Sequence, residues 1–90
     1  MRETNEDSAA LALRALTWTL SDDARAQRLL ALTGLEVADL RERLGDPALL
    51  DAALGFLEAH QNDLVACAQA LEVKPERLIE ARHALTQEPL

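Results

Sequence analysis

The sequence predicts an all-α protein, folded as a compact orthogonal bundle of five to six short helices. Leucine and alanine, which both favour helices, make up 36 of the 90 residues. Residues that favour strands are scarce, with three valines, one isoleucine, five threonines and no tyrosine. A chain of this length is expected to form one domain. We therefore expect residues 1–90 to be a single helical domain with an ordered core at about residues 5–86.

Capping and helix-breaking residues divide the chain into six expected helices. Ser21 is expected to cap the second helix, and Gly34 to end it in a left-handed conformation. Asp46 followed by Pro47 is a typical helix start, an N-cap and then proline at the first helical position. Asn62 is expected to cap the fifth helix. The expected helices are residues 5–20, 22–33, 37–44, 47–59, 63–71 and 75–86.

The fourth expected helix has the widest apolar surface, which predicts a position near the centre of the bundle. Its apolar residues are Leu49, Leu50, Ala53, Leu54, Phe56 and Leu57.

The first expected helix has apolar residues on two opposed sides, at about 100° per residue. One stripe contains Ala9, Leu13, Leu16 and Leu20, and the other contains Leu11, Ala15 and Trp18. A helix of this kind is either enclosed within its own protein or binds a partner on its second side. We expect Leu11, Arg14, Ala15 and Trp18 to form a partner-binding face, with Arg14 stacked on the indole ring. The partner is another protein or a second copy of the chain in a homodimer. The alternative is that Trp18 lies at the edge of the core.

Charge and cysteine content limit the possible partners and location. Sixteen acidic residues face nine basic ones, a formal net charge of −7, which disfavours nucleic acid and anionic membranes as partners. Cys67 is the only cysteine, so no intrachain disulfide can form. The polar, acidic N-terminus lacks the pattern of a secretory signal, and no apolar stretch is long enough to span a bilayer. We expect a soluble cytoplasmic protein.

Few residues are candidates for catalysis or ligand binding. One cysteine and two histidines, His60 and His83, do not supply the closely spaced ligands of a metal site. Cys67 lies in an apolar stretch and is expected to be a small core residue rather than a nucleophile. No glycine-rich phosphate loop is present. We therefore expect no enzymatic activity, no cofactor, no metal and no small-molecule ligand.

The alternative function is DNA binding by a helix-turn-helix unit at residues 62–85. This segment has small residues, then an aliphatic residue in the turn, then a polar second helix. That spacing is similar to the spacing in DNA-binding helix-turn-helix units. Its second helix, however, carries Glu76 and Glu80 beside Arg77 and Arg82, and a DNA reader normally presents a net basic face. Nucleic acid is therefore the less favoured partner.

Several short motifs resemble a small bacterial family of all-helical proteins, known only as a domain of unknown function. They are Ala31-Leu32-Thr33-Gly34-Leu35, Asp39-Leu40-Arg41, Asp46-Pro47, Phe56-Leu57, Pro75-Glu76 and Ala81-Arg82. The resemblance covers roughly residues 11–85 and implies a helical fold without an assigned activity.

The chain departs from this family's pattern at three positions. Cys67 stands where the family has an aromatic residue, which implies a smaller core side chain there. Glu72 and Lys74 stand where the family has glycine and a capping aspartate. A residue other than glycine in a left-handed turn costs on the order of 1 kcal/mol, so we expect a less stable corner between the last two helices.

Overall fold

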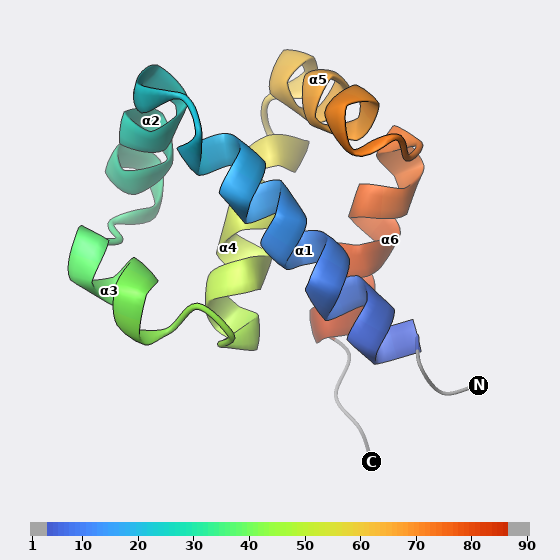
Figure 1. Cartoon of the computed structure of the whole chain (residues 1–90), viewed down its shortest axis with the longest axis horizontal. Coiled ribbons are helices and arrows are strands. Elements are labelled where there is room, and N and C mark those ends of the chain that lie inside the picture. The colour runs from blue at the N-terminus through green and yellow to red at the C-terminus, as the bar shows by residue number, and fades with distance from the viewer. Residues whose placement is uncertain (1–3, 87–90) are drawn as a thin grey trace.

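The computed structural model describes the backbone of residues 4–86 and the side chains of residues 8–86. Over that range the chain forms six helices and no strand, which confirms the all-α fold (Figure 1). The helices are α1 (Thr4–Leu20), α2 (Asp23–Thr33), α3 (Val37–Glu42), α4 (Pro47–Glu58), α5 (Gln61–Leu71) and α6 (Pro75–Thr86).

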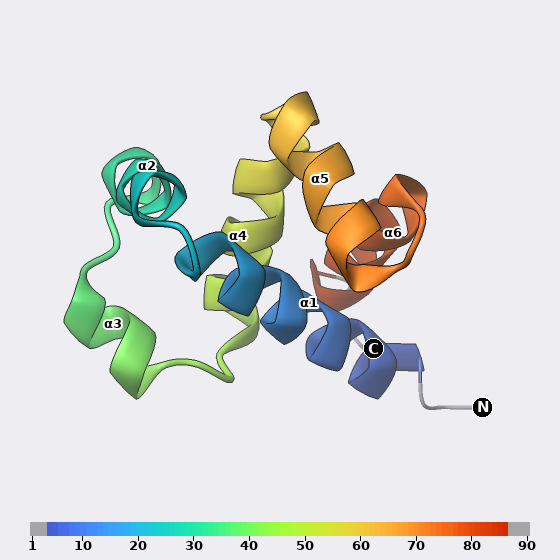
Figure 2. The same cartoon turned by 45° about the horizontal axis from the view of Figure 1, so that its top comes forward.

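The helices cross one another around α1 and α4. Figure 1 shows α1 running diagonally across the molecule in front of α4, with α2 and α3 on one side and α5 and α6 on the other. Figure 2 shows the same arrangement from a second direction. Helix α1 packs against α4 and α6 and also touches α2 and α5, while α4 packs against α6 as well. Both α1 and α4 are therefore central.

Helix α4 contributes the largest share of the core. Its apolar surface is buried, as its sequence predicts: the buried residues are Leu49, Leu50, Ala53, Leu54, Phe56 and Leu57. Asp46 caps this helix by accepting a hydrogen bond from the Ala48 amide at 2.9 Å, and Pro47 follows at the first helical position. The predicted start of α4 is confirmed.

Helix α1 buries one wide face that takes residues from both predicted apolar stripes, so the expectation that the second stripe as a whole faces a partner is wrong. Its buried residues follow helical spacing and are Ser8, Leu11, Ala12, Ala15, Leu16 and Thr19. Leu16, from one predicted stripe, and Ala15, from the other, are both fully buried. The small polar residues Ser8 and Thr19 extend this face, and the Thr19 hydroxyl donates to the Ala15 carbonyl oxygen at 2.9 Å.

Two predicted helix caps differ from those observed, while one helix end is confirmed. Helix α2 is capped by Asp22, whose carboxylate accepts from the Arg25 amide at 3.0 Å, and not by Ser21. The hydroxyl of Ser21 donates instead to the carbonyl oxygen of Trp18 at 2.6 Å. Helix α5 begins at Gln61, before Asn62. Gly34 ends α2 with φ of 76°, in the predicted left-handed conformation.

The corner between α5 and α6 contains the strained residue that the family resemblance implies. Glu72 has φ of 61° and ψ of 43°, the left-handed conformation that favours glycine. The amide of Val73 donates to the Ala68 carbonyl oxygen at 2.9 Å, which closes the end of α5. The helix ends as a glycine-terminated helix would, but with the steric cost of a Cβ atom.

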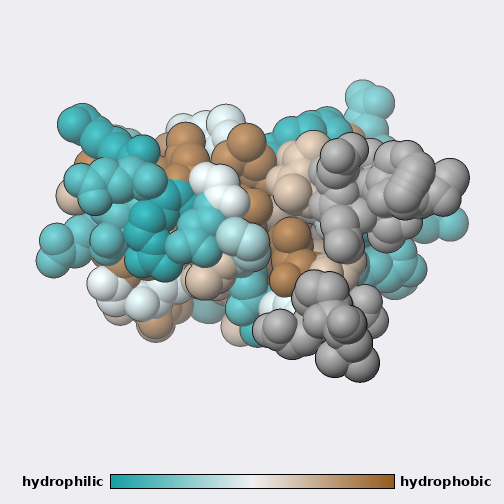
Figure 3. All heavy atoms as spheres, turned by 90° about the horizontal axis from the view of Figure 1, so that it is seen from below, coloured by the Kyte–Doolittle hydropathy of each residue, from teal (hydrophilic) through white to brown (hydrophobic). Residues whose placement is uncertain are grey.

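Helix α3 is short and lies away from the crossing of α1 and α4 (Figures 1 and 2). Leu40 is its buried residue, whereas Val37 is exposed, and Leu44 beyond its end is exposed too. Figure 3 views the molecule from below and shows apolar side chains reaching the surface between hydrophilic ones. Some apolar surface therefore remains uncovered by the fold.

Candidate functional site

The candidate site is a shallow apolar hollow between α1 and the end of α5, which we call the Trp18 groove. Its volume is about 420 Å³, and it is lined by Leu13, Arg14, Thr17, Trp18 and Leu71. The first four of these residues are neighbours on the surface of α1, and Leu71 is the last residue of α5. Leu13 is 38% exposed, and Trp18 is half-buried against the core. The groove thus offers an aliphatic and an aromatic side chain at one place.

Arg25 of α2 covers the indole of Trp18. Its Cζ atom lies 3.6 Å from the centre of the Trp18 ring, and its Nη2 donates to the Trp18 carbonyl oxygen at 2.7 Å. A guanidinium stacked on an indole face is a favourable cation–π contact. The prediction that Arg14 stacks on this ring is wrong, because Arg14 points across the groove and donates to the Leu71 carbonyl oxygen at 3.3 Å.

The structure divides the predicted partner-binding residues into two groups. Trp18 and Arg14 line the groove. Ala15 is fully enclosed, and Leu11 is 6% exposed, so neither provides the apolar surface expected of it. Both point into the core because α1 packs against α4 and α6 on the side that carries them.

The sequence reasoning missed three residues of the groove: Leu13, Thr17 and Leu71. Leu13 was assigned to the stripe opposite Trp18, although the two residues border the same hollow. Positions 13, 14, 17 and 18 are neighbours on a helix surface, and this spacing could have revealed them. The contribution of Leu71 depends on the packing of α5 against α1, which no local pattern shows.

A second hollow of about 290 Å³ adjoins the groove along α1. It is lined by Ala10, Leu11, Arg14, Val73 and Arg77. Arg14 therefore lies between the two hollows and borders both.

The described residues do not form a catalytic arrangement around Cys67. Its thiol is fully buried, and this burial raises its pKa to about 11. A thiol with such a pKa is protonated at neutral pH and is a poor nucleophile. Among the described residues no group of three His, Cys, Asp or Glu side chains is placed to hold a metal ion.

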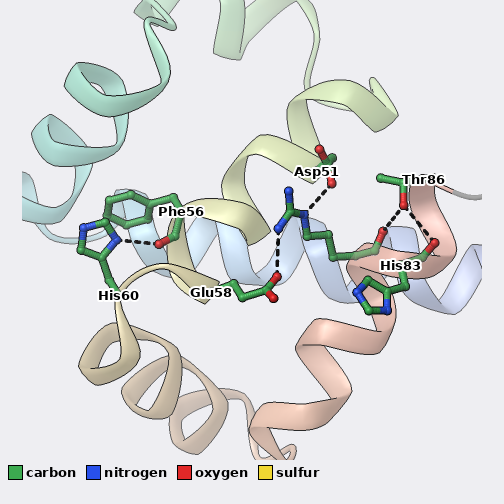
Figure 4. Close-up of polar contacts among 7 residues, drawn as sticks. Asp51, Phe56, Glu58, His60, His83 and Thr86 are labelled. Carbon is green, nitrogen blue, oxygen red and sulfur yellow. Dashed lines mark hydrogen bonds and ion pairs between the residues drawn. The ribbon is translucent and has the colours of Figure 1, made fainter.

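His60 lies at the junction of α4 and α5, far in sequence from the groove. Its ring centroid is 4.6 Å from that of Phe56, and its Nδ1 is 2.7 Å from the Phe56 carbonyl oxygen (Figure 4). The ring is half-buried in these contacts. The contacts give His60 a packing role at the end of α4.

The outward face of α6, which would read DNA in the alternative function, is largely acidic. Glu76, Glu80 and His83 are exposed along it at helical spacing. Arg82 instead turns inward and donates to Asp51 at 2.8 Å and to Glu58 at 2.9 Å (Figure 4). These carboxylates raise the pKa of Arg82 further above its usual value and hold its charge against α4.

The described residues thus form an all-helical fold with a shallow, largely apolar hollow on its surface. Residues 5–88 match the family described as Protein of unknown function (DUF3572), and the chain belongs to this family. No similar curated protein and no similar solved structure was found. Within residues 4–86, none of the helices has the length and apolar character needed to cross a membrane.

Proposed function

We propose that this protein is a non-catalytic interaction module whose Trp18 groove binds an apolar segment of a partner protein. The supporting observation is the pairing of a half-buried tryptophan with a 38% exposed leucine, Leu13, at the rim of one hollow. Aromatic residues in partly formed pockets are the usual anchors of protein interfaces. The proposal retains Trp18 and Arg14 as binding residues and replaces Leu11 and Ala15 with Leu13, Thr17 and Leu71.

The charge on α6 favours a protein partner over DNA. A helix that enters the major groove approaches phosphates closely, and carboxylates on its outer face oppose that approach. Glu76 and Glu80 occupy this face, while Arg82 is engaged with α4. DNA binding is therefore the competing outcome of the test, not the proposal.

We also propose that the module acts in the cytoplasm. The chain has a single thiol, which is buried and free, and this suits a reducing compartment.

A matched pair of variants tests the groove. Leu13→Gln replaces an apolar residue of the groove with a neutral side chain of similar size that also favours helices. Leu32→Gln makes the same change on α2, at a residue that is 63% exposed and lies outside the groove. We expect immobilised wild type and Leu32→Gln to retain the same protein from a cell extract, and Leu13→Gln to lose it.

Three results would count against the proposal. Equal retention by both variants would show that the groove is not the binding surface. Retention of no protein by the wild type would remove its basis. Binding of duplex DNA with an affinity that falls steeply as salt rises would instead support the helix-turn-helix function. Light scattering on wild type and Leu13→Gln tests whether the partner is a second copy of the chain. A dimer that forms in the wild type and is lost in Leu13→Gln would identify a second copy as the molecule bound in the groove.

A further inference from the structure

The two hollows beside α1 share Arg14 as a lining residue, and we call the surface that contains both of them the α1 strip. Ala10 marks one end and Trp18 the other, and Arg14 borders both hollows between them. At about 1.5 Å per residue, this part of α1 is about 12 Å long, which is about two turns of a helix. The strip therefore has the length to contact a short helical segment of a partner, and the side chains of such a segment could enter both hollows.

Three arginines border the α1 strip. Arg77 lies at the end near Ala10, Arg14 in the middle, and Arg25 covers Trp18 at the other end. These are three of only nine basic residues in a chain with a net charge of −7. The described linings of the two hollows contain Arg14 and Arg77 and no acidic residue. The strip is therefore richer in positive charge than the protein as a whole, although Glu76 lies next to Arg77 and Asp22 lies near Arg25.

The charges of Arg25 and Arg14 both act on the buried thiol of Cys67. They lower its pKa, against the larger effect of burial, which raises it.

A second copy of the chain fits this surface poorly. In a two-fold dimer the same patch meets itself, so the arginines of one copy would face those of the other. Like charges across an interface are unfavourable, and the two copies also repel through their net charges. The occupant that complements the strip carries apolar side chains and negative charges.

From these observations we infer that the segment bound by the α1 strip is an acidic amphipathic helix of another protein. The inference rests on the function proposed above. The apolar residues of the bound helix enter the groove beside Trp18 and Leu13, and the carboxylates of the bound helix pair with Arg14 and Arg77. At physiological salt, charges interact over about 8 Å, so a bound segment is affected most by Arg14 and Arg77, which line the strip, and less by carboxylates elsewhere on the protein.

A random peptide library selected on the immobilised full chain tests this inference. Each enriched peptide is then measured against wild type and four variants, using Trp18 emission as the reporter, since it is the only tryptophan. Leu13→Gln removes the apolar contact and Leu32→Gln is its control. Arg77→Glu reverses a charge of the strip, and Arg41→Glu makes the same reversal at an exposed residue of α3. Circular dichroism verifies that each variant is folded.

We expect the enriched peptides to be acidic and amphipathic. Their binding should fail with Leu13→Gln, weaken about tenfold with Arg77→Glu, and remain unchanged with Leu32→Gln and Arg41→Glu. Groove-dependent peptides that are neutral or basic and insensitive to Arg77→Glu would overturn the acidic partner and leave the proposed function standing. If no enriched peptide depended on Leu13, both would be overturned.

Discussion

A Cβ atom at Gly55 would lie 3.1 Å from Cζ of Arg82, so the guanidinium of Arg82 occupies the space that the missing side chain leaves. Asp51 and Glu58 lie on the same face of α4 as this glycine, on either side of it. They accept hydrogen bonds from Arg82 at 2.8 and 2.9 Å. Glycine at position 55 therefore leaves room for Arg82, which ties α6 to α4 through these two hydrogen bonds.

The first prediction concerns the coupling of Gly55 to Arg82. Replacing a helical glycine with alanine stabilises a helix by about 1 kcal/mol. When Arg82 is present, however, the new Cβ atom displaces the guanidinium and weakens two partly exposed ion pairs. We expect Gly55→Ala alone to change the free energy of unfolding by less than about 0.5 kcal/mol. In the Arg82→Ala background the same change should stabilise by about 1 kcal/mol. Urea unfolding of the wild type, the two single variants and the double variant measures this double-mutant cycle. Equal effects of Gly55→Ala with and without Arg82 would show that the two residues are independent.

The second prediction concerns the left-handed Glu72 at the end of α5. Glycine adopts this conformation without the clash of a Cβ atom, so Glu72→Gly should raise the free energy of unfolding by about 1 kcal/mol. Glu72→Ala removes the same charge but keeps the Cβ atom and should give no such gain. Thermal and urea unfolding compare the two variants. A similar gain from both would assign the effect to charge instead of backbone strain.

The third prediction concerns the stacking of Arg25 on Trp18. Arg25→Ala removes the cation–π contact and the hydrogen bond to the Trp18 carbonyl oxygen, and should lower the free energy of unfolding by about 1–2 kcal/mol. It should also shift the emission of Trp18 to longer wavelength, because water reaches the uncovered ring. Fluorescence-detected unfolding measures both effects. Arg41→Ala, an exposed control on α3, should change neither, and an unshifted Arg25→Ala spectrum would contradict the contact.

The fourth prediction concerns stability in alkaline solution. The pKa of Cys67 is raised from 9.0 to about 11 in the folded protein, so between these values the folded state keeps a proton that the unfolded state has lost. Stability from this thiol is complete below pH 9 and is lost as pH rises towards 11, by up to about 3 kcal/mol. Unfolding of wild type and Cys67→Ala between pH 9 and pH 11 shows how steeply the free energy of unfolding of each protein falls with pH. Parallel curves would show that the thiol titrates normally.

Local signals in the sequence predicted most of the helix framework. Asp46 and Pro47 set the start of α4, and Gly34 sets the end of α2, through contacts with residues only a few positions away. These two helix ends therefore follow from the local sequence alone. The breadth of the apolar surface of α4 likewise predicted its burial. The choice of Ser21 over Asp22 as a cap failed because adjacent residues both have capping side chains, and only the observed hydrogen bond distinguishes them.

The candidate site was predicted only in part, because it depends on contacts between helices. The buried face of α1 includes Ser8 and Thr19, and a search for apolar residues alone misses it. Trp18 is covered by Arg25 from α2 and not by Arg14, although Arg14 is closer in sequence. Which arginine reaches the ring is decided by the packing of α2 against α1, and helical periodicity contains no information about it.

The isolation of α3 affects how the molecule unfolds. Leu40 anchors this helix, while Val37 and Leu44 remain in water. A segment with so little buried surface opens at a lower free energy than the rest of the chain. Within residues 4–86, the residues between Gly34 and Asp46 should therefore exchange their amide hydrogens and be cut by proteases before the other five helices, which stay folded as one cooperative unit.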